Sequence, residues 1–266
     1  MTRLLVTSDI HSNLSALEAV LNDAQKHGPY DRKYCTGDVV GYGPFPNEVI
    51  QVIRHHQFIT IQGNHDRAVF SGNFDGLTRY ARAAAIHNHC ILSDDSREFL
   101  SRLGNSPHID RTLGIALVHG SFAGLPHQET GRARFEDIYV TDADSATKAI
   151  AAAEQYGVRL GIFGHTHIPT YATYKSKIDS SFNQYFIGPV KPVVSRTKKH
   201  SILFNPGSVG QPRNFSPAAS YGVVTIGKCR IVLEWMQVPY DIASTQAAMR
   251  KEKLPPMLIS RLLCGA

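Results

Sequence analysis

Apolar residues recur along the first third of the chain with the periods of alternating strands and helices. Short apolar runs at 4–6, 32–36 and 58–61 are typical of buried strands, whereas apolar positions within 14–24 and 46–56 recur at helical spacing. This βαβαβ order predicts a mostly parallel sheet with right-handed crossovers. The first third of the chain is therefore predicted to have an α/β fold.

The middle of the chain continues this alternation. Residues 77–103 have a helical pattern that is interrupted at 93–95, and a strand is expected at 115–118. An alanine-rich helix is predicted at 144–156, and it leads into a further strand at 159–163.

From residue 171 onward the pattern changes to short β-like runs, which suggests a second sheet that is mostly antiparallel. Residues 242–263 are predicted to be helical, with an interruption at Pro255-Pro256. The predicted strands of the second sheet are residues 185–187, 202–204, 221–226 and 231–236.

Five short polar motifs follow predicted strands in a fixed order. In open α/β sheets ligands bind outside the carboxyl ends of the strands, and the first three motifs fall there. Together the motifs supply two aspartates, an asparagine and four histidines, enough to hold two metal ions that share one carboxylate, and one further histidine. The motifs are Asp9-Ile10-His11, Gly37-Asp38, Gly63-Asn64-His65-Asp66, Val118-His119-Gly120 and Gly164-His165-Thr166-His167.

The motifs are spread from residue 9 to residue 167, and no linker interrupts the chain. We therefore expect residues 1–266 to form a single domain. Within it, residues 175–200 are expected to be a basic insertion or hairpin, and residues 240–266 a C-terminal helical segment.

The spacing within the motifs bears on their geometry. Asp9 and His11 are two residues apart, and in an extended backbone such residues point to the same face. His165 and His167 have the same spacing. A third such pair at 87–89 lies in a helical pattern, where residues two apart point to nearly opposite faces, so it is not expected to bind metal.

The chemistry of these side chains narrows the choice of metal. Carboxylate, imidazole and amide oxygen without thiolate favour manganese, iron, cobalt, nickel or zinc over copper(I) or an iron–sulfur cluster. The imidazoles disfavour a site that holds only magnesium or calcium, because both ions prefer oxygen ligands. Two such ions about 3.5–4 Å apart can clamp a phosphoryl group and activate a water for in-line attack.

This order of motifs resembles that of the calcineurin-like metallophosphoesterase superfamily. The resemblance covers residues 9–167, and residues 205–213 are similar to its small bacterial phosphodiesterase and diadenosine-tetraphosphatase-like branch. It implies an α/β fold in four layers, an α/β/β/α sandwich in which two mixed sheets pack face to face with helices outside.

The resemblance also implies a role for each motif residue. His65 would protonate the leaving oxygen and Asp66 would orient it, as for a general acid beside a carboxylate. The cofactors would be two divalent transition metal ions, with manganese favoured. The first ion would be bound by Asp9, His11 and His167, the second by Asn64, His119 and His165, and Asp38 would bridge the two.

Departures from the family pattern bear on the substrate. The arginine that protein phosphatases and symmetrical diadenosine tetraphosphate hydrolases carry after Gly-Asp is missing from residues 39–44, and GNHD replaces the GNHE of protein phosphatases. Arg67 and Arg213 are therefore candidates for holding phosphate, because guanidinium suits its geometry, although both could be ordinary surface residues. Asn13 could hydrogen-bond a substrate oxygen or cap a helix. Tyr42 could stack on a base or pack under a loop.

Composition fits these expectations. Lys and Arg number 28 against 22 Asp and Glu, which suits a polyanionic substrate but equally a mildly basic surface. The basic residues within 175–200 could steer anions, although solvated loops often carry such charge. The four cysteines have no paired spacing, which is typical of reduced thiols in a cytoplasmic protein. The apolar stretch at the amino terminus has only three residues, and no long apolar run follows. We therefore expect a cytoplasmic protein without membrane association.

The leading hypothesis is a dinuclear metallophosphoesterase that hydrolyses a nucleotide-type phosphoanhydride or phosphodiester, best a diadenosine polyphosphate, by attack of a metal-bridging hydroxide. The partner would be a phosphorylated small molecule or nucleotide, and the oligomeric state stays open. A broad phosphodiesterase or nuclease is the alternative if residues 175–200 bind nucleic acid, a less favoured partner. An inactive scaffold of the same fold is disfavoured, because His65 and all seven presumed ligands are present.

Overall fold

The computed structural model describes residues 1–104, 106–124, 134, 136–174, 180–184, 193–195 and 201–266. Within these residues the strands form two mixed sheets, in the orders β3-β2-β1-β11-β12-β9 and β4-β5-β6-β10-β7-β8. Both combine parallel and antiparallel pairs: β1 is parallel to β2 but antiparallel to β11, and β10 is parallel to β6 but antiparallel to β7.

The elements predicted from the sequence have bounds close to those observed, and the structure adds a helix at 64–71 and short strands that were not predicted. The first sheet consists of β3 (Ile59–Thr60), β2 (Arg32–Cys35), β1 (Thr2–Thr7), β11 (Ala219–Ile226), β12 (Arg230–Val238) and β9 (Val193–Ser195). The second consists of β4 (His108–Asp110), β5 (Ile115–Leu117), β6 (Leu160–Ile162), β10 (Ile202–Asn205), β7 (Thr170–Tyr174) and β8 (Ser180–Gln184). The helices are α1 (Leu14–Gln25), α2 (Pro46–His55), α3 (Asn64–Ser71), α4 (Arg79–Ile91), α5 (Asp94–Ser101), α6 (Ala143–Gln155), α7 (Ile242–Lys251) and α8 (Pro256–Ser260), with a 3₁₀ turn at Arg261–Leu263.

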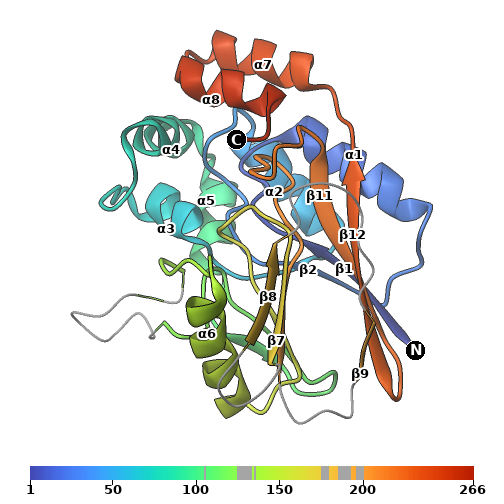
Figure 1. Cartoon of the computed structure of the whole chain (residues 1–266). Helices are drawn as coiled ribbons and strands as arrows, with labels where there is room; N and C mark the ends of the chain where they lie inside the picture. Colours follow the sequence, from blue (N-terminus) through green and yellow to red (C-terminus); the bar gives the residue numbers. More distant parts are fainter. Residues whose placement is uncertain (105, 125–133, 135, 175–179, 185–192, 196–200) are drawn as a thin grey trace.

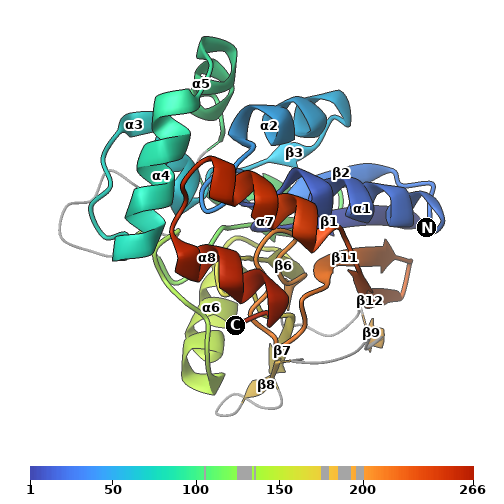
Figure 2. The same cartoon turned by 90° about the horizontal axis from the view of Figure 1, so that it is seen from above.

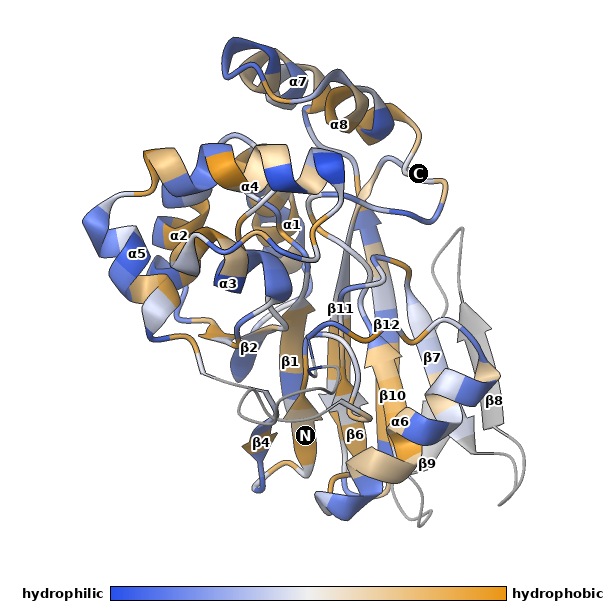
Figure 3. Ribbon diagram, turned by 90° about the vertical axis from the view of Figure 1, so that its left-hand side faces the viewer, coloured by the Kyte–Doolittle hydropathy of each residue, from blue (hydrophilic) through white to orange (hydrophobic). Residues whose placement is uncertain are grey.

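The two sheets pack face to face over a shared apolar core. Leu4 and Val224 of the first sheet lie in one cluster with Leu160 of the second. Trp235 of β12 and Phe204 of β10 meet across the interface with ring centroids 4.8 Å apart, and the Trp235 Nε1–H donates to the Asn205 carbonyl at 2.7 Å. The apolar colouring of β6 and β10 in Figure 3 reflects this burial.

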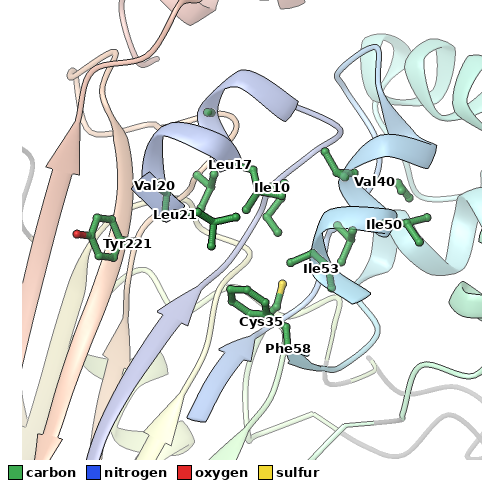
Figure 4. Packing of buried hydrophobic residues seen from close by; sticks show 14 of the residues in the cluster. Ile10, Leu17, Val20, Leu21, Cys35, Val40, Ile50, Ile53, Phe58 and Tyr221 are labelled. Atoms are coloured by element: carbon green, nitrogen blue, oxygen red, sulfur yellow. The ribbon is translucent and has the colours of Figure 1, made fainter. Parts of the chain in front are cut away.

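Helices cover the outer faces, which completes the predicted four layers (Figure 1). Figure 4 shows Leu17 and Val20 of α1 with Ile50 and Ile53 of α2, packed near Cys35 of β2. Each such side chain stabilises the fold by about 1.5–3 kcal/mol when fully buried. On the second sheet, α6 packs its alanine-rich face over β10 and β7.

The prediction that the C-terminal strands form a separate, mostly antiparallel sheet is wrong. β11 pairs with β1, with Leu5 opposite Val223, and so joins the N-terminal strands. β10 joins the other sheet beside β6. Nearly every residue of β11 is buried, as expected for a central strand covered on both faces, but local periodicity does not say which sheet a buried strand enters.

The C-terminal segment forms α7 and α8, broken at Pro255-Pro256 as predicted. Figure 2 shows these helices lying across one end of the molecule beside α4 and α1, and Met249 and Leu258 pack against Ala84 and Tyr42. The helices of the described part of the chain are too short or too polar to span a lipid bilayer. The predicted strand at 185–187 and most of the basic segment 175–200 lie outside the described residues.

Candidate metal centre

The loops that follow β1, β2, β5 and β6 bring the predicted ligands into two neighbouring groups. Both groups are buried, and the candidate ligand atoms within each lie within 4.8 Å of one another. The Asp38 carboxylate belongs to both. The first group is Asp9, His11, Asp38 and His167, and the second is Asp38, His119 and His165.

Individual distances show how tightly Asp38 joins the groups. Its Oδ2 atom lies 3.2 Å from Nε2 of His119 and 3.6 Å from Nε2 of His11. In the first group, Asp9 Oδ1 lies 3.3 Å from Nε2 of His167. Asn64, at the start of α3, adds its Oδ1 atom 3.2 Å from Nε2 of His119 and so completes the second group.

The backbone at the ligands differs from what the sequence suggested. Asp9 and His11 have φ of +52° and +51°, and His165 and His167 have φ of +65° and +62°, so neither pair is extended. These are left-handed conformations that non-glycine residues seldom adopt and that concentrate at functional sites. His167 lies with Asp9 and His11, and His165 lies with His119, which is the division that the family resemblance implied, although the spacing alone predicted a shared face.

Two motif glycines are required by close packing. A Cβ atom on Gly164 would lie 1.9 Å from Oγ of Ser8, and one on Gly63 would lie 2.2 Å from Oδ1 of Asp38. Both contacts are far below van der Waals distance. Ser8 in turn donates its hydroxyl to Oδ2 of Asp9 at 2.5 Å, which leaves Oδ1 facing the first group.

Backbone carbonyls orient three of the imidazoles. Nδ1–H of His11 donates to Val40 O at 3.2 Å. Nδ1–H of His119 donates to Thr36 O at 2.8 Å. Nδ1–H of His167 donates to Gln211 O at 2.6 Å. Such contacts fix the tautomer that presents an Nε2 lone pair to a metal.

The resulting lone pairs converge as a metal site requires. Nε2 of His11 and Nε2 of His167 are only 3.1 Å apart. Because the proton of each ring is on Nδ1, both Nε2 atoms are acceptors. They therefore repel each other unless a cation lies between them. Nε2 of His165 is buried without a hydrogen-bond partner among the described residues. The donor set therefore fits divalent metal ions, as the sequence indicated.

Electrostatics within the cluster are dominated by burial and by Asp38. Burial lowers the pKa of His11 well below its ordinary value, although Asp38 opposes this. Burial alone would lower the pKa of His119 as well, yet the Asp38 charge and hydrogen bond raise it to about 10. Burial would raise the pKa of Asp38, but His119 and His65 hold it well below its ordinary value.

His65 lies beside the two groups without belonging to either. Its backbone N–H donates to Oδ1 of Asp38 at 2.8 Å, and its ring is 4.5 Å from Tyr42 and 4.8 Å from His11. Its Nδ1 atom faces the Gly41 backbone, so closely that a Cβ atom there would lie at 2.4 Å. Burial lowers the pKa of His65 to about 4, although Asp38 opposes this.

The sequence interpretation expected Asp66 to orient the His65 imidazole, but the structure does not place its carboxylate against that ring. Its carboxylate accepts from Val40 N and from Gly63 N, each at 3.0 Å. Because Asp66 is the third residue of α3, its side chain reaches back to cap the helix and tie it to the loop after β2. It holds the turn that carries His65 rather than the ring itself.

The three predicted substrate contacts have different surroundings. Arg67 lines the cavity but pairs with Glu136 and, at 3.0 Å, with Asp137. Arg213 also lines it, and its guanidinium donates to Tyr42 Oη at 3.4 Å. Asn13 is not brought to the cavity: its Oδ1 caps α1 through Ala16 N, as the alternative interpretation allowed.

A cavity of about 670 Å³ opens from the metal centre toward α3 and α4. Asp38, His65 and His165 form its inner end. It is also lined by residues of the turn between α3 and α4 and by Tyr139. Its volume suits a nucleotide-sized ligand, since small-molecule pockets span about 300–1,000 Å³.

Sequence reasoning missed Asn88 entirely. This fully buried side chain accepts from Gly41 N at 2.7 Å and from Ser12 Oγ at 2.7 Å, and it donates to Gly43 O at 2.9 Å. It thereby fixes the loop that places Tyr42 against His11 and His65. Its signal in the sequence is an amide on the buried face of α4, in helical register with three alanines at positions 81, 84 and 85.

Comparisons with known proteins agree with this geometry. The model of the calcineurin-like phosphoesterase superfamily domain matches residues 2–228. The chain is 33% identical over 263 residues to an uncharacterized Methanocaldococcus jannaschii protein, with 98% of each covered. A crystal structure of a Sphaerobacter thermophilus metallophosphoesterase, 31% identical, superposes with a TM-score of 0.77 over the whole of both chains. A Pseudomonas putida symmetrical bis(5'-nucleosyl)-tetraphosphatase is 27% identical over 126 residues, 46% of this chain and 42% of that protein.

Proposed function

Because the chain belongs to the calcineurin-like phosphoesterase superfamily and is thus a hydrolase of phosphate esters, we propose that it acts on nucleotide-type phosphodiesters or phosphoanhydrides, with diadenosine polyphosphate as the specific candidate. The observation that carries the proposal is the position of Asp38, whose carboxylate belongs to both ligand groups. A shared carboxylate is the arrangement that suits two metal ions acting on one phosphoryl group.

The residues proposed to bind the first ion are Asp9, His11 and His167. Asn64, His119 and His165 are proposed to bind the second, and Asp38 is proposed to bridge them. When bound, two divalent ions neutralise the phosphoryl oxygens and lower the pKa of a water molecule so that it can attack the phosphorus. Manganese is the ion proposed for the assays, and the same carboxylate and imidazole ligands also suit iron, cobalt, nickel and zinc.

His65 is proposed to donate the proton that the leaving oxygen needs. It lines the cavity beside Asp38 without belonging to either ligand group. Burial keeps its pKa near 4 in the free protein, and the negative charge of a bound phosphate would raise that value. Asp66 supports this role indirectly by fixing the turn on which His65 stands.

Arg213 is the better candidate of the two arginines for contact with phosphate. Its side chain lines the cavity beside Tyr42, whereas the guanidinium of Arg67 is already neutralised by Glu136 and Asp137. Arg67 can contact phosphate only if these ion pairs open.

The nucleotide preference rests on the similarity to a bis(5'-nucleosyl)-tetraphosphatase over less than half of the chain, and on the size of the cavity. The missing arginine after Gly37-Asp38 leaves the cleavage position open. Symmetric cleavage of diadenosine tetraphosphate would yield two ADP, and asymmetric cleavage would yield ATP and AMP.

The test is an assay of manganese-loaded protein on dinucleotide polyphosphates, cyclic nucleotides, phosphomonoesters and oligonucleotides, with the products identified. We expect dinucleotide polyphosphates to be the best substrates. Turnover of phosphomonoesters or oligonucleotides alone would refute the substrate assignment.

Two variants test the roles of the residues. His65→Ala should retain metal but lose about 10²–10⁴-fold in turnover, the usual worth of a positioned acid. Asp38→Ala should lose metal and activity together. Near full activity of His65→Ala on a substrate with a poor leaving group would show that His65 is not the acid.

A further inference from the structure

Tyr139 combines two properties that no sequence motif indicated. Its ring lies over the His165 imidazole, with centroids 3.9 Å apart and planes inclined by 33°. Yet the residue is 47% exposed and lines the cavity that leads to the metal centre. One face of the ring is therefore covered by His165, while about half of the residue's surface stays exposed.

We propose that the open face of Tyr139 is the surface on which a nucleobase of the substrate stacks. This inference rests on the proposed function, because it assumes that a phosphate of the same molecule binds at the metal centre. It assigns Tyr139 as a residue that selects nucleotides over other phosphate esters.

The neighbouring ring makes Tyr139 a rigid platform. His165 lies between Tyr139 and His119, whose ring centroid is 5.0 Å from that of His165. His119 is in turn held by the Thr36 carbonyl at 2.8 Å. A base that stacks on Tyr139 would therefore extend a row of rings that is already ordered, so little side-chain entropy is lost on binding.

The wall formed by α3 and α4 offers contacts for the other parts of a nucleoside. Ala68, Leu77 and Ala81 provide apolar surface in the cavity, and Asn73 and Thr78 provide hydrogen-bonding groups. Such a mixture of apolar walls and a few polar groups is typical of sites for planar organic ligands. The metal ligands and Arg213 lie at the inner end of the same cavity, where a phosphate would bind.

The simpler interpretation is that Tyr139 serves only to pack against His165. In three of the four histidines of the ligand groups, Nδ1 contacts a backbone carbonyl, whereas the His165 ring contacts the rings of Tyr139 and His119. Packing alone would make Tyr139 a determinant of metal affinity and not of base recognition. The experiment must therefore separate these two effects.

The probes are AMP and ribose 5-phosphate, which differ only in the base, and their binding to the manganese-loaded protein is measured by calorimetry. Stacking on an aromatic side chain is worth about 1–3 kcal/mol per base, so the native protein should bind AMP about 5- to 150-fold more tightly. Tyr139→Leu, which keeps an apolar side chain but removes the ring, should abolish most of this preference. Tyr139→Phe should retain it.

Ribose 5-phosphate and the metal content of each variant serve as controls. If Tyr139→Leu binds ribose 5-phosphate and manganese like the native protein but loses the preference for AMP, the inference is supported. Equal binding of both probes by the native protein, or an unchanged preference in Tyr139→Leu, would overturn it. An equal loss for both probes together with loss of metal would show that Tyr139 only packs against His165.

Failure of the inference can be told apart from failure of the proposed function. Hydrolysis of dinucleotide polyphosphates with no preference for AMP would refute the stacking role alone. A preference for AMP without hydrolysis of any dinucleotide or phosphodiester would refute the proposed reaction but leave the base subsite.

Discussion

Replacing Asn88 tests whether the loop beside the metal centre depends on one buried amide. Its side chain makes hydrogen bonds of 2.7 Å to Gly41 N, 2.7 Å to Ser12 Oγ and 2.9 Å to Gly43 O. Asn88→Leu keeps the number and branching of the side-chain heavy atoms and removes all three bonds. The Ser12 hydroxyl can rotate toward another acceptor, but the N–H of Gly41 and the carbonyl of Gly43 are left buried without this partner.

The cost follows from these two backbone groups. A buried polar group without a partner costs about 1–3 kcal/mol, so the variant should lose about 2–6 kcal/mol of stability. Typical domains have only about 5–15 kcal/mol in total, so the loss should be easy to measure. Asn88→Asp keeps the acceptor, but its ionised form would bury a charge against the Gly43 carbonyl, so its loss of stability should grow as the pH rises.

The assay is urea unfolding followed by far-UV circular dichroism, with stability taken from the midpoint at an unchanged slope. Asn22→Leu is the matched control, because Asn22 is exposed on α1 and the same substitution there should change stability by less than about 0.5 kcal/mol. If Asn88→Leu lost no more than about 1 kcal/mol, or no more than the control, the loop would not depend on this amide.

Three further changes probe the centre itself. Gly41→Ala would place a Cβ atom 2.4 Å from Nδ1 of His65 at a residue with φ of +97°, so turnover should fall sharply while metal content, measured by mass spectrometry, changes little. Asp38 raises the pKa of His119 to about 10 in the metal-free protein. At any pH below this value a metal ion must therefore displace a proton from His119 in order to bind. Manganese affinity should therefore rise up to about tenfold per pH unit between pH 7 and 9, and a flat profile by calorimetry would contradict this. Chelation should lower the melting temperature, because an ion at 100 times its Kd contributes about 2.7 kcal/mol; an unchanged melting curve would argue against a bound ion.

The order of motifs predicted which residues gather within each sheet, because β1 and β2 in the first sheet and β5 and β6 in the second are neighbouring parallel strands whose carboxyl ends meet at one edge. The sequence did not reveal the sheet to which each C-terminal strand belongs, because β10 and β11 are similar apolar runs that pair with different partners. Nor did it reveal that Asp66 bonds to backbone N–H groups, since its neighbour in sequence, His65, was the more obvious partner.

Asn88 illustrates the same limit in a side chain. The sequence interpretation considered the two histidines that flank it and set them aside because they lie on different faces of a helix. The structure agrees: Nδ1 of His89 contacts Val69 O at 2.7 Å, and His87 lies 3.9 Å from Glu252. The residue between them faces the loop instead. Its importance follows from long-range hydrogen bonds, which periodicity alone does not indicate.

The left-handed backbone of the ligand turns is stabilised by contacts between the turns themselves. A left-handed residue other than glycine costs about 1–2 kcal/mol, less for the aspartates and histidines that tolerate it best. Here Asp9 N donates to Gly37 O at 3.1 Å, and His11 N donates to Asp38 O at 3.0 Å, so the turn after β1 is bonded directly to the turn after β2. Gly210 N donates to Asp9 O at 2.9 Å from a third segment.

These bonds mean that the ligand positions are fixed by the fold and not by the metal. The repulsion between the Nε2 atoms of His11 and His167, 3.1 Å apart, is then a property of an already ordered site. A cation that binds there relieves the repulsion without having to order any of these turns, so its binding free energy is not reduced by a folding cost. The same rigidity holds Asp38 between the two groups, which is where a carboxylate must stand if two ions are to act on one phosphoryl group.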